Sequence, residues 1–78
     1  MTPLEVQIMK ILEEEAAAHQ TTVGVLIGHD RSAWRTAARQ RVMWRARTEL
    51  KAPYHVIGKM LHRNHATIIH GIRKYEER

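Results

Sequence analysis

Three polar side chains with different hydrogen-bonding chemistry lie together in one short segment of the chain. Asn64 is a favoured N-cap residue, so a helix is expected to begin there and to carry His65 and Thr67 in its first turn. In a DNA major groove an asparagine can pair with adenine, a threonine methyl can contact thymine, and a histidine can donate or accept a hydrogen bond. The amides and dipole of the same helix end favour phosphate. A capping role alone is an equally good account of Asn64.

Positive charge is concentrated in one part of the chain. Residues 31–74 carry eight arginines and three lysines against a single acid, Glu49, and the whole chain has a net charge of +5. So many like charges repel one another in a folded chain, and a polyanion such as nucleic acid removes that repulsion. Residues 1–30 are acidic instead, and Glu13–Glu15 are expected to form a solvated face that repels DNA. A solvated basic surface without a partner is the alternative interpretation.

The composition gives little support to other functions. The 78 residues fit one small domain, residues 1–78, and are too few for an ATPase core. No nucleophile–base pair, carboxylate pair or glycine-rich phosphate loop indicates an enzyme or a cofactor. His62, His65 and His70 lack the cysteine or carboxylate partners of a metal site. With no cysteine and no apolar run of about 18 residues, the chain is expected in the cytoplasm and not in a membrane.

Helical patterns position these residues. Thr2, Pro3 and Glu5 form a helix-start signature, with a capping threonine, a proline in the first turn and a glutamate three residues after the cap. Ser32 is expected to cap a long arginine-rich helix, and the two tryptophans are expected to pack between helices. Apolar residues at helical spacing predict helices over residues 3–19, 33–50, 54–61 and 65–76, and a short apolar turn or helix over residues 23–27. No strand pattern is present, so the predicted fold class is a compact all-α domain.

The last two predicted helices form a pair with a known layout. They are separated by a tight turn at His62 and Arg63, and the second helix has a polar, basic outer face. This is the layout of a helix-turn-helix, whose second helix enters the major groove with its N-terminal residues at the base edges.

The chain resembles the C-terminal DNA-binding domain of DnaA, the bacterial chromosomal replication initiator, in two ordered blocks. One block is Arg39-Gln40-Arg41-Val42-Met43-Trp44, which is similar to Arg-Gln-Ile-Ala-Met-Tyr of that family. The other joins Ile57-Gly58 to Arg63-Asn64-His65-Ala66-Thr67-Ile68-Ile69-His70-Gly71, which is similar to the family's Ile-Gly and Arg-Asp-His-Thr-Thr-Val-hydrophobic-His-Ala. The resemblance covers roughly residues 6–75. It implies a DnaA C-terminal-domain-like fold, similar to that of the Trp repressor.

The resemblance also implies roles for individual residues. It implies that Asn64, His65 and Thr67 read bases in the major groove. It implies contacts to the DNA backbone or minor groove by a second set, namely Arg31, Arg35, Arg39, Arg47, Tyr54, His55 and Arg63. Contacts of the second kind position a protein on DNA, and only the first kind specify sequence.

The sequence departs from the family pattern at several points. The turn before Arg63 is one residue shorter, Asn64 replaces an aspartate, and Ala66 replaces the first of two threonines. The family's minor-groove arginine falls on Ala37, with Arg35 half a turn away as a substitute. We therefore expect base recognition with a preference that differs from that of the family.

The expected function is sequence-specific binding of double-stranded DNA by a monomer that regulates transcription or replication initiation. Such a protein could act on transcription, or it could instead occupy initiator boxes and compete with the initiator. Besides DNA, its partners could include the full-length initiator or other replication and transcription proteins. Its setting would be the bacterial nucleoid, or the host cytoplasm if a phage or plasmid encodes it. The rival hypothesis is a protein-interaction module. In it the acidic first helix would bind a partner through the apolar face over residues 4–12, and the basic half would dock on an acidic protein or on the initiator itself.

Overall fold

The computed structural model describes all of residues 1–78 and contains helices but no strand. The helices are α1 (Pro3–Ala18), α2 (Val23–Ile27), α3 (Ala33–Leu50), α4 (Tyr54–Leu61) and α5 (His65–Glu76). The all-α class and the predicted helices are confirmed, with ends that differ from the expected ones by at most one residue. None of these helices combines the length and the apolar character that crossing a bilayer requires.

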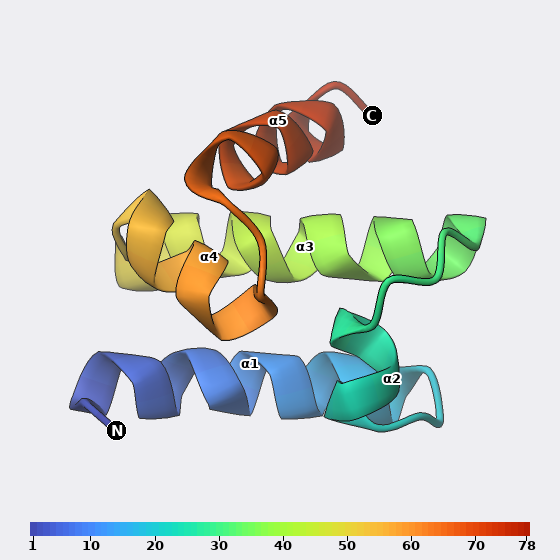
Figure 1. The fold of residues 1–78 in the computed structure, drawn as a ribbon, viewed down its shortest axis with the longest axis horizontal. Helices are drawn as coiled ribbons and strands as arrows, with labels where there is room; N and C mark the ends of the chain where they lie inside the picture. Colours follow the sequence, from blue (N-terminus) through green and yellow to red (C-terminus); the bar gives the residue numbers. More distant parts are fainter.

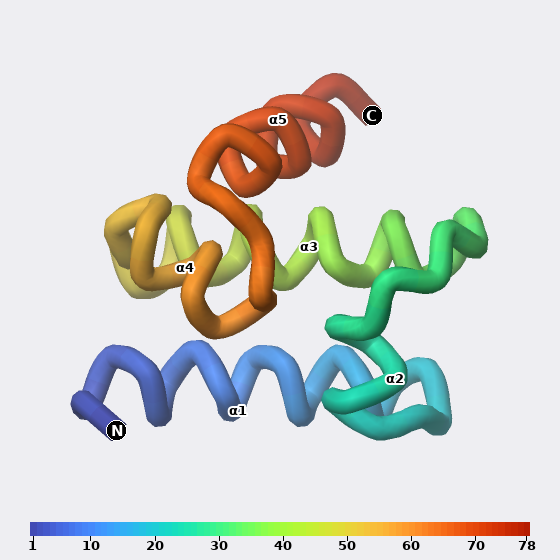
Figure 2. The backbone as a smooth tube through the Cα atoms, viewed as in Figure 1, coloured from blue at the N-terminus to red at the C-terminus, as the bar shows by residue number.

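The long helix α3 is the centre of the fold. It runs antiparallel to α1, and α5 packs on its other side more extensively than any other helix does (Figures 1 and 2). Gly71 allows this close packing, because a side chain there would meet the Met43 sulfur of α3. The short helices α2 and α4 fill the space between α1, α3 and α5.

All five helices contribute to one hydrophobic core. Its members recur every three or four residues in α1, α3, α4 and α5, as expected for helices with one buried face. The core consists of Ile8, Ile11, Leu12, Ala16, Leu26, Ala38, Val42, Met43, Ala46, Ala52, Ile57, Met60, Leu61, Ile68 and Ile72. Trp44 packs against Tyr75 with ring centroids 5.0 Å apart, as predicted. Trp34 differs from the prediction, because it is 40% exposed and lies against His19 at the edge of the core.

Two of the predicted helix caps are confirmed and one is wrong. At α1 the Thr2 hydroxyl accepts from the Glu5 amide at 3.1 Å, and the Glu5 carboxylate accepts from the Thr2 amide at 2.8 Å. At α5 the Asn64 side-chain oxygen accepts from the Thr67 amide at 2.9 Å. Ser32 occupies the N-cap position of α3, but its side chain makes no capping bond. Its amide instead donates to the Asp30 carboxylate at 2.6 Å, which fixes the preceding loop.

The turn between α4 and α5 is short because one residue adopts a left-handed conformation. His62 has φ 58° and ψ 41°, which ends α4 after Leu61. The Arg63 amide then donates to the Gly58 carbonyl at 2.9 Å, and Asn64 caps the next helix. This six-to-one bond is typical of a helix that ends in a left-handed residue, a position that glycine usually occupies.

A glycine at position 62 is expected to stabilise the protein. The left-handed region disfavours a residue with a side chain, so His62→Gly should raise the free energy of unfolding by roughly 0.5–1 kcal/mol. Chemical denaturation measures the change. Glu13→Gly, in the exposed middle of α1, is the control and should lower the same quantity by about 1 kcal/mol. A loss of stability in His62→Gly would contradict this account of the turn.

Candidate nucleic-acid interface

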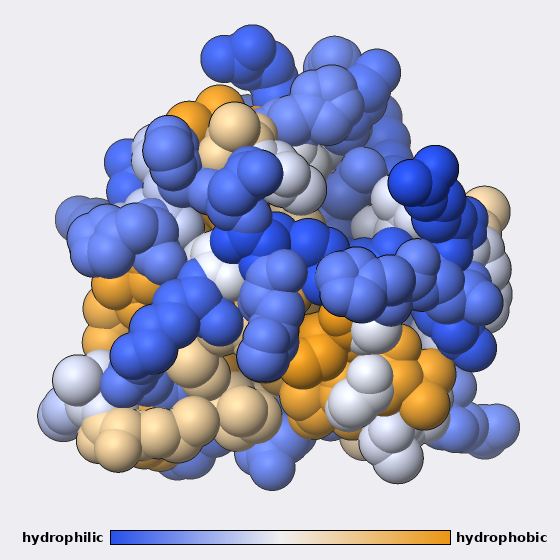
Figure 3. All heavy atoms as spheres, viewed as in Figure 1, coloured by the Kyte–Doolittle hydropathy of each residue, from blue (hydrophilic) through white to orange (hydrophobic).

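Helix α5 presents a polar face to solvent along its whole length. The exposed residues are Asn64, His65, Ala66, Thr67, His70, Arg73, Lys74 and Glu76, so the one acid among them is at the C-terminal end of the helix. Ile68, Gly71 and Ile72 are buried on the other face. The helical period of 3.6 residues separates the two faces, and the predicted division into an inner and an outer face is confirmed. In Figure 3, hydrophilic residues predominate around α5, with some hydrophobic atoms among them, while a larger hydrophobic area lies over α1 and α2.

Local hydrogen bonds at the start of α5 limit what its side chains can offer a ligand. The Asn64 side-chain oxygen accepts from the Thr67 amide at 2.9 Å and from the Thr67 hydroxyl at 3.1 Å. Both lone pairs of this oxygen are therefore used, while the Asn64 amide nitrogen and the Thr67 methyl group have no partner. The His65 ring, which follows the cap, has no partner in the chain and is exposed.

Helix α4 begins without a side-chain cap. Pro53 occupies its N-cap position and has no side-chain acceptor, while its carbonyl accepts from the amides of Val56 and Ile57. The amides of Tyr54 and His55 are therefore free to bind an anion. His55 is exposed there, and Tyr54 is half-buried under the Arg47 guanidinium, 4.2 Å from the ring centroid. Arg47 also donates to the Ala52 carbonyl at 3.1 Å. The structure thus brings three of the sequence-predicted backbone-contacting residues together at the start of α4.

The loop between α2 and α3, residues 28–32, and the first turn of α3 each carry one more of the predicted residues. Arg31 is exposed, and its guanidinium has no hydrogen bond or ion pair within the chain. Arg35 lies one turn into α3 and pairs with the Asp30 carboxylate at 3.0 Å. The pKa of Asp30 is lowered, first by the hydrogen bond from the Ser32 amide and also by the charge of Arg35. Together these segments therefore offer one free cation and one that is partly neutralised.

Arg39 and Arg63 differ from the prediction that they face DNA phosphates. Arg39 is only 7% exposed, and it donates to the carbonyls of Leu26, Gly28 and Asp30 at 3.0, 3.2 and 2.9 Å. Its guanidinium is therefore turned into the protein, where these backbone carbonyls hold it.

Arg63 is bound in a similar way. Its guanidinium donates to the carbonyls of Ile27, Gly28 and Leu61 at 2.8, 2.7 and 2.7 Å. It is half-buried between the loop and the turn that precedes α5. Both arginines thus hold backbone groups of the chain.

A shallow hollow separates the start of α5 from α3. Three sequence-predicted residues line it, namely Arg39, Arg63 and Thr67. The other lining residues were not predicted as site residues: Thr36, Gln40, Met43, His70 and Gly71. Helical spacing is the signal that could have found the α3 residues, because positions 36, 40 and 43 share one face of a helix. No carboxylate lines this hollow.

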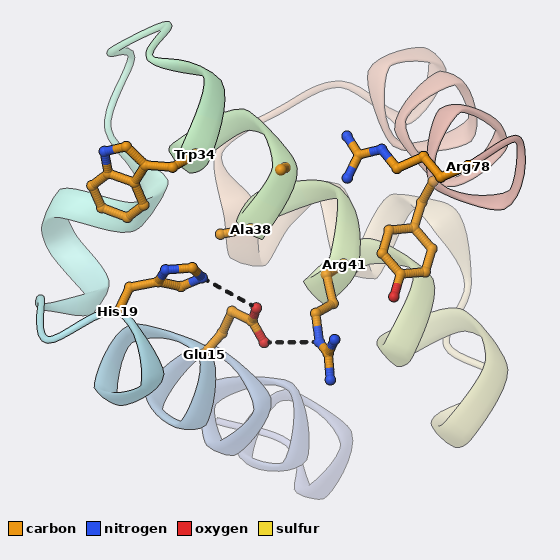
Figure 4. Close-up of a pocket in the computed structure, with 8 residues that line it drawn as sticks. Glu15, His19, Trp34, Ala38, Arg41 and Arg78 are labelled. Atoms are coloured by element: carbon orange, nitrogen blue, oxygen red, sulfur yellow. Dashed lines mark ion pairs between the residues drawn. The ribbon is translucent and has the colours of Figure 1, made fainter.

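The opposite side of α3 has a different electrostatic character. Figure 4 shows the hollow there, where Glu15 of α1 lies between His19 and Arg41. Its α3 residues are at positions 34, 37, 38 and 41, about half a helical turn away from positions 36, 40 and 43. The ion pairs of Glu15 measure 3.6 Å to His19 and 3.3 Å to Arg41. The carboxylate of Glu15 therefore lies on the side of α3 away from the start of α5.

Two sequence-based expectations about charge are wrong. Glu15 is 6% exposed and not solvated, because α1 packs along α3 with this side chain in the interface. The basic half of the chain also does not lack acidic partners, since α1 supplies them. Glu14 accepts from Arg45 at 2.9 Å, and Glu5 accepts from Lys59 at 2.8 Å. Within residues 31–74, the cations without an ion pair are Arg31, Arg39, Arg47, Lys51, Arg63, Arg73 and Lys74.

The ion pair of Glu5 predicts a loss of stability in acid. The pKa of Glu5 is lowered from 4.5 to about 2, chiefly by the hydrogen bond from Lys59 and next by that from the Thr2 amide. The ionised carboxylate therefore stabilises the fold above pH about 4.5, and this contribution is lost as the pH falls towards 2. Urea denaturation across this range should show the decline.

A matched pair of variants isolates the contribution of Glu5. Glu5→Gln keeps a residue that can complete the capping box but removes the charge, so it should flatten the pH dependence. Glu13→Gln, an exposed carboxylate without an ion pair, should leave the dependence as in the native chain. Equal slopes in the native chain and in Glu5→Gln would contradict the assignment.

No three histidine or acidic side chains of the chain converge in a metal-binding arrangement.

The family model of the bacterial dnaA protein helix-turn-helix matches residues 8–74. The match includes most of α1, all of α2, α3 and α4, and α5 as far as Lys74. No curated protein and no solved structure matches the chain.

Proposed function

Because the chain belongs to the bacterial DnaA helix-turn-helix family, a family of DNA-binding domains, we propose that it binds double-stranded DNA in a sequence-specific way through α5. The observation that carries this proposal is the exposed first turn of α5, which offers three different polar groups and no acid. In a helix-turn-helix this turn lies at the base edges of the major groove.

The reading residues of the proposal are Asn64, His65 and Thr67. Because the Asn64 oxygen is occupied by its own helix, Asn64 would donate from its amide nitrogen to an acceptor such as a purine N7. This differs from the two-bond pairing with adenine that an uncommitted asparagine makes. His65 can donate or accept, and the Thr67 methyl group can contact a thymine methyl.

Positioning contacts would come from two places beside the reading helix. One is the loop of residues 28–32 with Arg31, which we call the basic loop, together with Arg35 in the first turn of α3. The other is the uncapped start of α4, with Arg47, Tyr54 and His55, where free amides and a nearby cation suit a phosphate. The exposed Glu13 and Glu14 and the buried Glu15 lie on the other side of α3. Their negative charge would keep that side away from the duplex.

A protein with these properties would act as a regulator of transcription or of replication initiation. Where it occupies an initiator-type box, the initiator cannot bind the same box, so occupancy would restrain initiation by competition. If the protein bound in the same way to a DNA site at a promoter, it would repress or activate transcription instead.

Fluorescence anisotropy tests the proposal. A labelled duplex carrying an initiator-type box is titrated beside a scrambled duplex, at low and at near-physiological salt. Binding should weaken with salt at a log–log slope of about −0.9 per phosphate contacted, and a preference for one sequence should persist at the higher salt. If the box is not preferred, a random-sequence selection identifies the sequence that is. Binding to neither duplex would refute the proposal and would favour the protein-interaction module.

A further inference from the structure

Two guanidinium groups from distant parts of the chain meet at one carbonyl oxygen. The Gly28 carbonyl accepts from Arg39 of α3 at 3.2 Å and from Arg63 of the α4–α5 turn at 2.7 Å. Together these two side chains also hold the carbonyls of Leu26, Ile27 and Asp30. We call Arg39, Arg63 and the carbonyls of residues 26, 27, 28 and 30 the arginine clamp. It joins the basic loop to the helix-turn-helix across 35 residues of sequence or more.

The geometry of α2 explains why the clamp forms there. This helix has only five residues. The last carbonyls of any helix accept no hydrogen bond from within that helix, so they are open to other donors. Leu26 and Ile27 are the last two residues of α2, and their carbonyls form the negative end of its dipole. Guanidinium groups are favourable partners for such carbonyls.

The clamp keeps two like charges close together inside the protein. Burial and, next, the charge of Arg63 lower the pKa of Arg39. The Asp30 carboxylate is directed to Arg35 and to the Ser32 amide, so neither clamp arginine has a carboxylate in hydrogen-bond contact. Such an arrangement opposes folding unless the carbonyl bonds are well made. A loosely held surface arginine would show neither this burial nor this nearby like charge.

We propose that Arg39 and Arg63 are positioning residues that fix the basic loop on the helix-turn-helix, so that Arg31 and the first turn of α5 approach DNA as one rigid surface. The inference rests on the proposed DNA binding. Its physical basis is preorganisation: a loop that must be ordered on binding lowers affinity, whereas a loop already held in place does not. Neither clamp arginine needs to touch the DNA for this role.

The structural half of the proposal is tested without DNA. Backbone ¹⁵N order parameters are measured in the native chain and in Arg39→Met and Arg63→Met. The order parameters of residues 28–32 should fall from about 0.85 to below about 0.6, while those of α1 and α5 keep the values of a rigid backbone. Unchanged values in the loop, or an equal loosening of every helix, would overturn the clamp. Arg39→Lys and Arg63→Lys serve if a methionine variant does not fold, because lysine keeps the charge but not the planar fork.

The functional half is tested by coupling to Arg31. In the native chain Arg31→Ala should weaken binding to any duplex several-fold and reduce the salt slope by about 1. In the Arg39→Met or Arg63→Met chain, or in its lysine counterpart, the same change should alter affinity less than about twofold, since the loop is no longer held at the DNA. An undiminished effect of Arg31→Ala would overturn the inference.

A control separates this outcome from general destabilisation. Ile11→Val, in the α1 core and away from the loop, removes one methyl group from a buried side chain. It should leave both the loop order parameters and the effect of Arg31→Ala as in the native chain. If the native chain binds no duplex, the proposed function fails, while the order parameters still decide whether the clamp exists.

Discussion

Alanine at His65 or at Thr67 is expected to weaken binding to the preferred duplex by about 1–3 kcal/mol, while binding to an unrelated duplex changes little. Both side chains are exposed in the first turn of α5, and His65 has no hydrogen-bond partner within the chain. Their removal therefore affects the reading of bases far more than the fold. Anisotropy titrations with the two duplexes at one salt concentration measure the difference.

Arg31→Ala is the control for this prediction. Its side chain is exposed in the basic loop, where it is proposed to contact phosphate. It should weaken binding to both duplexes by the same factor, because phosphates carry no sequence information. If His65→Ala and Thr67→Ala also weakened both duplexes equally, these residues would be positioning residues and another part of α5 would read the bases.

Asn64→Asp separates the capping role of this residue from its proposed reading role. Aspartate caps a helix about as well as asparagine does, so the stability of the protein should change little. The variant loses the free amide donor of Asn64, so the preferred sequence at that base pair should change. The two roles would not be distinct if the preference stayed the same in a random-sequence selection.

Alanine at Gly58 is expected to lower the free energy of unfolding by about 3 kcal/mol. A Cβ atom at this position would lie 2.5 Å from the Arg63 carbonyl oxygen, which belongs to backbone and cannot move alone. The turn must therefore shift, and the bond from the Arg63 amide to the Gly58 carbonyl is disturbed with it. Chemical denaturation measures the loss, and weaker DNA binding should accompany it because the start of α5 moves.

Gly24→Ala is the matched control for Gly58→Ala. Position 24 also lies in a short helix, but the nearest atom to a Cβ there is the Thr22 hydroxyl oxygen at 3.9 Å, an ordinary contact. Since the site accepts a side chain, alanine should stabilise the protein by roughly 0.5–1 kcal/mol. Similar losses in the two variants would show that close approach at Gly58 is not the cause.

The orientation of the molecule on DNA follows from how its charges are paired. The acids of α1 neutralise Arg41, Arg45 and Lys59, so the excess positive charge remains on the loop, on the end of α3 with Arg47 and Lys51, and on α5. A duplex would therefore be attracted to the side that carries the reading helix and repelled from the side that carries Glu13 and Glu14. This asymmetry favours productive encounters over random ones.

The sequence by itself determined the helices, the helix-turn-helix and the exposed face of α5. Apolar spacing and the caps at Thr2 and Asn64 depend on residues within about four positions of one another, so they can be read without knowing the fold. The resemblance at Arg39–Trp44 and Arg63–Gly71 identified the family for the same reason, because each block is contiguous.

Only the tertiary structure decided which partners the long charged side chains have. A guanidinium bonds equally well to a phosphate, a carboxylate or a backbone carbonyl, so the sequence could not show that Arg39 and Arg63 hold the end of α2. The burial of Glu15 was hidden for a related reason, since its partner Arg41 lies 26 residues away and is brought near by the packing of α1 on α3. Through-space partners of this kind depend on the positions of whole helices, which short-range patterns do not encode.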